Sequence, residues 1–167
     1  MTRWQGATTI IHQLAHMHVS QSTPWDERVF RRGAPYKALM MLAVSDGVRA
    51  EVFGDVAIIP LNDWLQQRYR QYVERCGDPV RNEPRMPFVH LQHEPFWRLM
   101  PQKPYTEVLE QWDLRSEEAF RQHVVGAELD ALLLAMMRDP RWHAVVRYVI
   151  VRAYFAAELA DDVWDMQ

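Results

Sequence analysis

The chain has 167 residues, of which 49% are apolar, and a formal net charge of −3. This length predicts a single domain that can bury a core without a disulfide or a metal. The one cysteine, Cys76, cannot form an internal disulfide, so we expect a reducing, cytoplasmic compartment. No apolar run approaches the ~20 residues of a membrane span, and residues 1–6 lack the pattern of a signal peptide.

The charges are distributed unevenly along the chain. Residues 1–105 carry 13 Lys/Arg and 10 Asp/Glu, whereas residues 106–167 carry 6 and 12. All of the cations except Lys37 and Lys103 are Arg, which matches the geometry of phosphate oxygens better than Lys does. Genomic base composition can produce the same preference for Arg. The basic half keeps nucleic acid open as a partner despite the negative total.

The first third of the chain predicts two helices joined by a basic loop. Apolar residues at helical spacing predict an amphipathic helix over 5–18. The turn-rich stretch 20–33 follows and ends in a cluster of Arg residues. Pro35 suits the first turn of a second helix, which would bury the apolar run 38–44.

The middle of the chain predicts a third helix and a hairpin. Asn62 is a good N-cap for the third helix, and Gly77 is typical of its end. Residues 58–61, just before it, predict either a short strand or a lead-in to this helix. Residues 86–92 and 96–100 bracket a turn and predict a β-hairpin, with Pro87 near the start of the first strand, where proline is tolerated.

The last third predicts three more helices. Ser116 is typical of a helix start, Gly126 interrupts the pattern, and Asp139-Pro140 begins the last helix. The expected fold class is therefore α+β, predominantly helical, with about six helices and a small antiparallel β-hairpin or sheet in the middle. We expect one domain over 1–157 and an acidic tail or linker over 158–167.

Signals for catalysis are weak. The sequence holds no Gly-x-Ser-x-Gly elbow and no glycine-rich phosphate loop. The histidine pairs lack the Cys or Glu partners typical of zinc sites, and packed or exposed imidazoles explain them equally well: His12 with His16, His16 with His18, and His90 with His93. We therefore expect no metal, no cofactor and no catalytic residues.

Two segments carry the candidate binding chemistry. In the basic segment 28–37, Arg31, Arg32 and Lys37 lie near a helix N-terminus, and Tyr36 adds an aromatic side chain for a sugar or a base. A solvated charged loop is the alternative interpretation. The second segment, 86–91, places a proline among apolar side chains and offers few hydrogen-bond donors; ordinary packing is its alternative.

Taken together and in order, these segments resemble the sulfur-binding domain that accompanies HNH nucleases in type IV, modification-dependent restriction enzymes. The resemblance covers residues 4–155. It rests on five stretches of sequence: Ala34-Pro35-Tyr36-Lys37, Ile59-Pro60-Leu61, Met86-Pro87-Phe88-Val89-His90-Leu91, Trp97-Arg98-Leu99, and Val124-Val125-Gly126 leading to Tyr154-Phe155. Met86 departs from the family, which has an aromatic residue at that position, and His90 stands where the family often has a small residue.

The resemblance implies a reader of double-stranded DNA in which sulfur replaces one non-bridging phosphate oxygen. The residues that it places on DNA are Arg31, Arg32, Tyr36, Lys37, Met86, Pro87 and His90. It also implies a nuclease effector, a C-terminal domain or a partner, because no HNH signature follows Phe155. Two other functions stay open: a basic protein-interaction or regulatory module, and a small nuclease with an unrecognised site.

Overall fold

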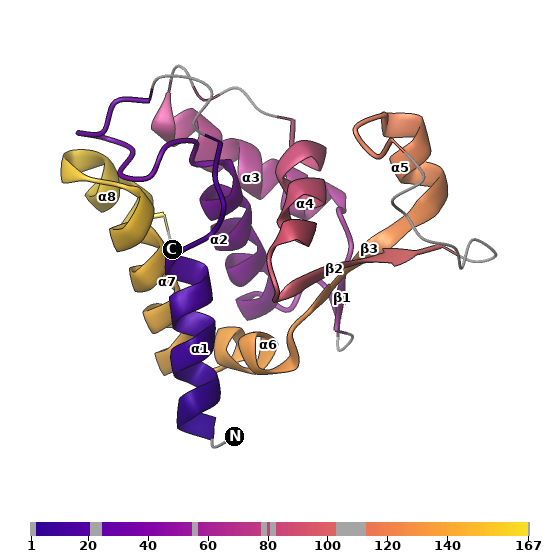
Figure 1. Ribbon diagram of the computed structural model, residues 1–167, viewed down its shortest axis with the longest axis horizontal. Helices are drawn as coiled ribbons and strands as arrows, with labels where there is room; N and C mark the ends of the chain where they lie inside the picture. Colours follow the sequence, from indigo (N-terminus) through magenta and orange to yellow (C-terminus); the bar gives the residue numbers. More distant parts are fainter. Residues whose placement is uncertain are drawn as a thin grey trace.

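The computed structural model describes residues 3–20, 25–54, 57–77, 80, 83–102 and 113–166. Within these ranges the chain forms eight α-helices, one short 3₁₀ helix and a three-stranded antiparallel sheet (Figure 1). In chain order the elements are α1 Arg3–Ala15, α2 Tyr36–Arg49, β1 Ile58–Ile59, α3 Asp63–Cys76, α4 Arg85–His90, η1 Leu91–His93, β2 Trp97–Pro101, α5 Glu117–His123, β3 Val124–Leu129, α6 Ala131–Arg138, α7 Pro140–Tyr154 and α8 Ala157–Trp164. The predominantly helical α+β class is confirmed, with more helices than the six expected.

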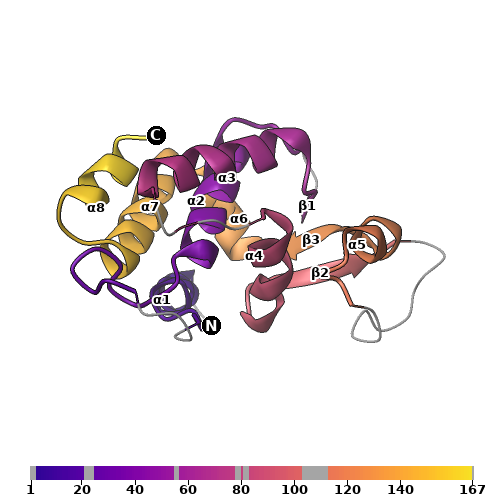
Figure 2. The same cartoon turned by 90° about the horizontal axis from the view of Figure 1, so that it is seen from above.

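Helix α2 forms the centre of the molecule. Every residue from Lys37 to Ser45 is buried, and α3, α4, α6 and α7 all pack against this helix. Seen from above, α1, α2, α3, α7 and α8 lie together on one side, while the sheet with α5 extends to the other (Figure 2). The apolar run predicted to be a buried helix therefore organises the helical half of the fold.

Helix α3 has the ends that its sequence predicts. The Asn62 side chain accepts a hydrogen bond from the Leu65 N–H at 2.9 Å, which satisfies one of the free donors at the helix start. Gly77 ends the helix with φ +69°, a conformation that favours glycine.

The sheet has the order β1-β3-β2, with both pairs antiparallel. Gly126, expected to interrupt a helical pattern, lies inside β3 instead. A Cβ at this position would lie 2.5 Å from the Ile59 carbonyl oxygen, so only glycine lets β1 approach β3 this closely.

The predicted β-hairpin over 86–92 and 96–100 is wrong in its first strand. Residues Arg85–His90 form helix α4, with Pro87 in its first turn. Proline is tolerated there because the N–H that it lacks has no partner within the helix. The second strand exists as β2, but its partner is β3, with Trp97 opposite Leu129.

The acidic stretch 158–167, expected as a tail or linker, is largely folded as helix α8. Val163 is completely buried. The buried Arg147 donates to the carbonyls of Val163 and Trp164, at 3.2 Å each, and a cation at a helix C-terminus is favourable. Helix α8 therefore packs on α7 and α3 as part of the same fold.

Candidate functional site

One cavity of about 720 Å³ brings the two candidate segments together. Five of the seven residues predicted to bind DNA line it: Tyr36, Lys37, Met86, Pro87 and His90. The remaining lining residues are His18, Val19, Ser20, Ala34 and His93. The start of α2 and the helix α4 therefore form two walls of one cavity, and the segment 18–20 after α1 contributes to its rim.

The wall formed by α4 is poor in hydrogen-bond donors. Pro87 is buried and has no N–H. On either side of it, the Met86 N–H donates to the Glu83 carbonyl at 3.0 Å and the Phe88 N–H donates to the Pro84 carbonyl at 3.3 Å. Three consecutive residues of this wall thus have no backbone donor left for a ligand.

Aromatic packing holds α4 against the sheet. The Phe88 ring meets the rings of Trp97 and Phe120 edge to face, with centroid distances of 5.0 and 5.7 Å. The indole N–H of Trp97 also donates to the Phe88 carbonyl at 2.9 Å. Edge-to-face pairs add about 0.5–1.5 kcal/mol beyond burial, so Met86, Pro87 and His90 stand on a well-anchored helix.

Lys37 lines the cavity, but its ammonium is already paired. Its Nζ donates to Glu94 Oε2 at 2.6 Å, and the exposed fractions of the two side chains are 10% and 2%. The His18 N–H donates to the same oxygen at 3.1 Å. This buried ion pair connects the start of α2, the segment after α1 and the turn before β2.

Histidines surround the cavity mouth. His18, His90 and His93 are all exposed as whole residues, and the rings of His90 and His93 lie 6.3 Å apart. Burial lowers the pKa of His90, and the positive charges of His93, Lys37 and Arg115 lower it further. His90 is therefore neutral at pH 7 and offers an imidazole that a nearby anion would help to protonate.

Arg31 and Arg32 are not among the residues that line the cavity. The exposed Arg31 donates through Nε to the Phe155 carbonyl at 2.9 Å. The Arg32 guanidinium lies over the Tyr154 ring, 5.9 Å from its centroid. Ala34, which does line the cavity, follows two residues later, so both Arg residues belong to the loop leading into it.

Glu94 and Arg115 were not among the site residues predicted from the sequence. Arg115 lies close enough to lower the pKa of His90, and Arg85 Nε donates to the Arg115 carbonyl at 3.2 Å. The sequence does hold a signal for Glu94, because it is the one acidic residue in the aromatic stretch 93–97. No sequence signal indicated Arg115, because it reaches the site only through the fold.

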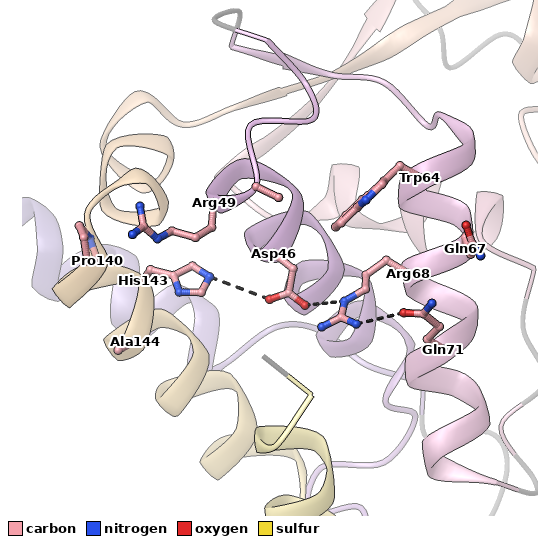
Figure 3. A pocket seen from close by; sticks show the side chains of 10 residues that line it. Asp46, Arg49, Trp64, Gln67, Arg68, Gln71, Pro140, His143 and Ala144 are labelled. Atoms are coloured by element: carbon pink, nitrogen blue, oxygen red, sulfur yellow. Dashed lines mark hydrogen bonds and ion pairs between the residues drawn. The ribbon is translucent and has the colours of Figure 1, made fainter.

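A second cavity, of about 690 Å³, lies among α2, α3 and the start of α7 (Figure 3). Asp46 accepts from Arg68 Nε at 2.9 Å and from Arg147 Nη1 at 2.7 Å, and the Tyr72 hydroxyl donates to it. His143 Nε2 lies 3.9 Å from the same carboxylate, and burial lowers the pKa of His143. None of the seven predicted residues lines this cavity.

No model of a known protein family matches the sequence, and no curated protein matches it. The resemblance to sulfur-binding domains therefore stays a prediction. Among the residues that the structure describes, no group of three or more His, Cys, Asp or Glu side chains could hold a metal ion. No helix in the described ranges has the length and apolar character needed to cross a membrane.

Proposed function

We propose that this chain binds double-stranded DNA that carries a phosphorothioate linkage, with the sulfur seated against Met86 and Pro87. The observation that carries the proposal is the shared cavity, because two segments chosen separately from the sequence meet around it. The family resemblance supplies the identity of the ligand, and the apolar, donor-poor wall of α4 supplies the chemistry.

Sulfur is larger than oxygen and accepts hydrogen bonds less well. Contact between sulfur and the Pro87 ring gains about 0.8 kcal/mol, the value of a buried methylene. An ordinary phosphate would place a strongly hydrated oxygen against a wall without a donor, which costs about 1–3 kcal/mol. Discrimination in this proposal therefore depends more on rejecting oxygen than on attracting sulfur.

Cations around the cavity supply affinity that does not depend on sulfur. Arg31 and Arg32 precede the start of α2, and Arg115 is near enough to lower the pKa of His90. Contacts of this kind release counterions from DNA and weaken as salt concentration rises. Tyr36 and His90 are the side chains best suited to contact sugars or bases beside the modified phosphate.

We infer that the chain is a recognition module of a modification-dependent restriction system in the bacterial cytoplasm. In this proposal cleavage belongs to an HNH nuclease, either a C-terminal domain or a separate partner. The site described here serves to bind DNA, not to cut it.

The direct experiment compares two labelled duplexes of identical sequence, one with a single phosphorothioate of defined stereochemistry and one without, by fluorescence anisotropy. We expect the modified duplex to bind at least about tenfold more tightly, which corresponds to ~1.4 kcal/mol. Equal affinities across several sequences would contradict the proposal. An interaction module would bind neither duplex, and a nuclease would nick them in the presence of Mg²⁺.

A further inference from the structure

Glu94 is a buried acid whose carboxylate pairs with Lys37 of the cavity wall. It is 3% exposed, and its Oε2 contacts both Lys37 Nζ, at 2.6 Å, and the His18 N–H, at 3.1 Å. Both of these residues line the cavity, and Glu94 does not. A ligand in the cavity therefore meets Lys37 and His18 in positions that Glu94 fixes.

Lys37 is the one Lys or Arg among the described residues that line the cavity. Its ammonium could donate to a phosphate oxygen, and a charged donor binds oxygen strongly. The carboxylate of Glu94 instead engages this ammonium and offsets part of its charge. The one Lys that lines the cavity is therefore already paired, and Met86 and Pro87 make the facing wall apolar.

We propose that Glu94 is a specificity-determining residue, which favours sulfur over oxygen by keeping the charge and the donors of Lys37 away from the phosphate. This inference rests on the proposed function, because it assigns a role within the same site. Glu94 acts through Lys37 and touches no ligand itself, so it is a positioning residue.

Glu94→Gln is the sharpest variant because it removes the charge and keeps the shape. The amide oxygen can still accept from the His18 N–H, so the segment 18–20 keeps its anchor. In this variant the ammonium of Lys37 has no carboxylate partner, so it can pair with a phosphate of the bound DNA. We expect the variant to bind the unmodified duplex about tenfold more tightly, in line with one charged hydrogen bond.

Two further readouts separate this effect from a general change in affinity. The affinity ratio between modified and unmodified duplexes should fall about tenfold in Glu94→Gln, because the gain goes mainly to oxygen. The slope of log affinity against log salt should steepen by about one unit, as expected for one additional phosphate contact. A folded variant with an unchanged ratio and an unchanged slope would overturn the inference.

The double variant Lys37→Met/Glu94→Gln tests the same idea without creating an unpaired buried charge. If the gain in Glu94→Gln comes from the freed Lys37 ammonium, the double variant should lose both the tenfold gain on unmodified DNA and the steeper salt slope. A slope that becomes shallower by about one unit would show that Lys37 contacts a phosphate in the native protein, and the inference would fail.

Failure of the proposed function would look different. A wild-type protein that binds both duplexes equally contradicts sulfur recognition, while the salt slopes of the two variants on unmodified DNA still test whether Glu94 withholds Lys37. A wild-type protein that binds neither duplex contradicts both proposals.

Discussion

The cations of the basic segment are held in two different ways. Lys37 is buried against Glu94, whereas Arg31 is exposed and its Nε donates to the Phe155 carbonyl. We therefore expect Arg31→Ala and Arg32→Ala to weaken modified and unmodified DNA about equally. Each substitution should flatten the salt slope by roughly one unit if the side chain contacts a phosphate.

Arg141→Ala is the matched control for these variants, since Arg141 is an exposed Arg at the start of α7, beside the second cavity. Affinities measured at several salt concentrations should show no change of slope for this control. Unchanged slopes for Arg31→Ala and Arg32→Ala as well would place the DNA on another surface. A changed sequence preference would instead indicate that one of them reads a base.

His90 should make DNA binding dependent on pH. Its pKa lies below the usual value in the free protein because of burial and the positive charges of His93, Lys37 and Arg115. A phosphate beside it favours the imidazolium and raises this pKa, so binding takes up a proton. Affinity should therefore rise as the pH falls from about 8 to about 6, the range in which histidine titrates.

Anisotropy titrations of the modified duplex across this range would measure the effect. His90→Asn should flatten the dependence, while His93→Asn separates the contribution of the neighbouring exposed ring. An identical pH dependence in wild type and His90→Asn would show that no phosphate lies near His90.

At the scale of elements, Gly126 determines how closely β1 and β3 pair. A methyl group at this position would meet the Ile59 carbonyl oxygen, which is backbone and cannot rotate away. We expect Gly126→Ala to lower the free energy of unfolding by about 1–3 kcal/mol, as overpacking usually does. Val125→Ala, on the adjacent exposed position of β3, should change it far less.

Chemical denaturation of the two variants would test this expectation. If Gly126→Ala proved as stable as Val125→Ala, the close approach of β1 to β3 would be wrong. The same comparison tests whether the sheet stabilises α4, because the indole N–H of Trp97 in β2 donates to the Phe88 carbonyl in α4.

The helices with clear caps and the strands β1 and β2 were predictable from the sequence, but β3 and the pairing of the strands were not. Asn62 and Gly77 determine the ends of α3 through local hydrogen bonds and backbone conformation. The run 86–91 contains a proline and apolar residues, which fit a strand start as well as a helix start. Its helical form depends on the packing of Phe88 against Trp97, a tertiary contact that local propensity does not contain.

At the scale of the whole molecule, sequence-based prediction meets the same limit in the buried polar cluster of Asp46, Tyr72, His143 and Arg147. Helical spacing puts Val145 of α7 on the same face as Trp142 and Val149, yet Val145 is exposed. The structure buries His143 and Arg147 instead, because Asp46 of α2 pairs with Arg147 and lies beside His143. An ion pair between residues a hundred positions apart has no signature in helical spacing.

The candidate site was predictable in part. The residues of its two walls were chosen from sequence, and the structure brings five of the seven around one cavity. Glu94 was missed because a single acid between His93 and Pro95 reads as a turn residue. Its role depends on Lys37, which lies on another element.

The central claim, that this cavity distinguishes sulfur from oxygen, is tested most directly at Pro87. Replacing it with Ser restores an N–H and adds a hydroxyl at the wall of the cavity, and Pro87→Ala restores the N–H alone. Both variants should lose sulfur preference, Ser more than Ala, by about 1–3 kcal/mol, while binding to ordinary DNA holds or rises slightly.

The measurement is the ratio of affinities for matched phosphorothioate and unmodified duplexes in wild type, Pro87→Ala and Pro87→Ser. Thermal melts must accompany it, because the loss of a proline from the first turn of α4 can itself lower stability by about 0.4–1 kcal/mol. The proposal predicts that the ratio falls from wild type to Ala and further to Ser. A folded Pro87→Ser that keeps the full sulfur preference would contradict it.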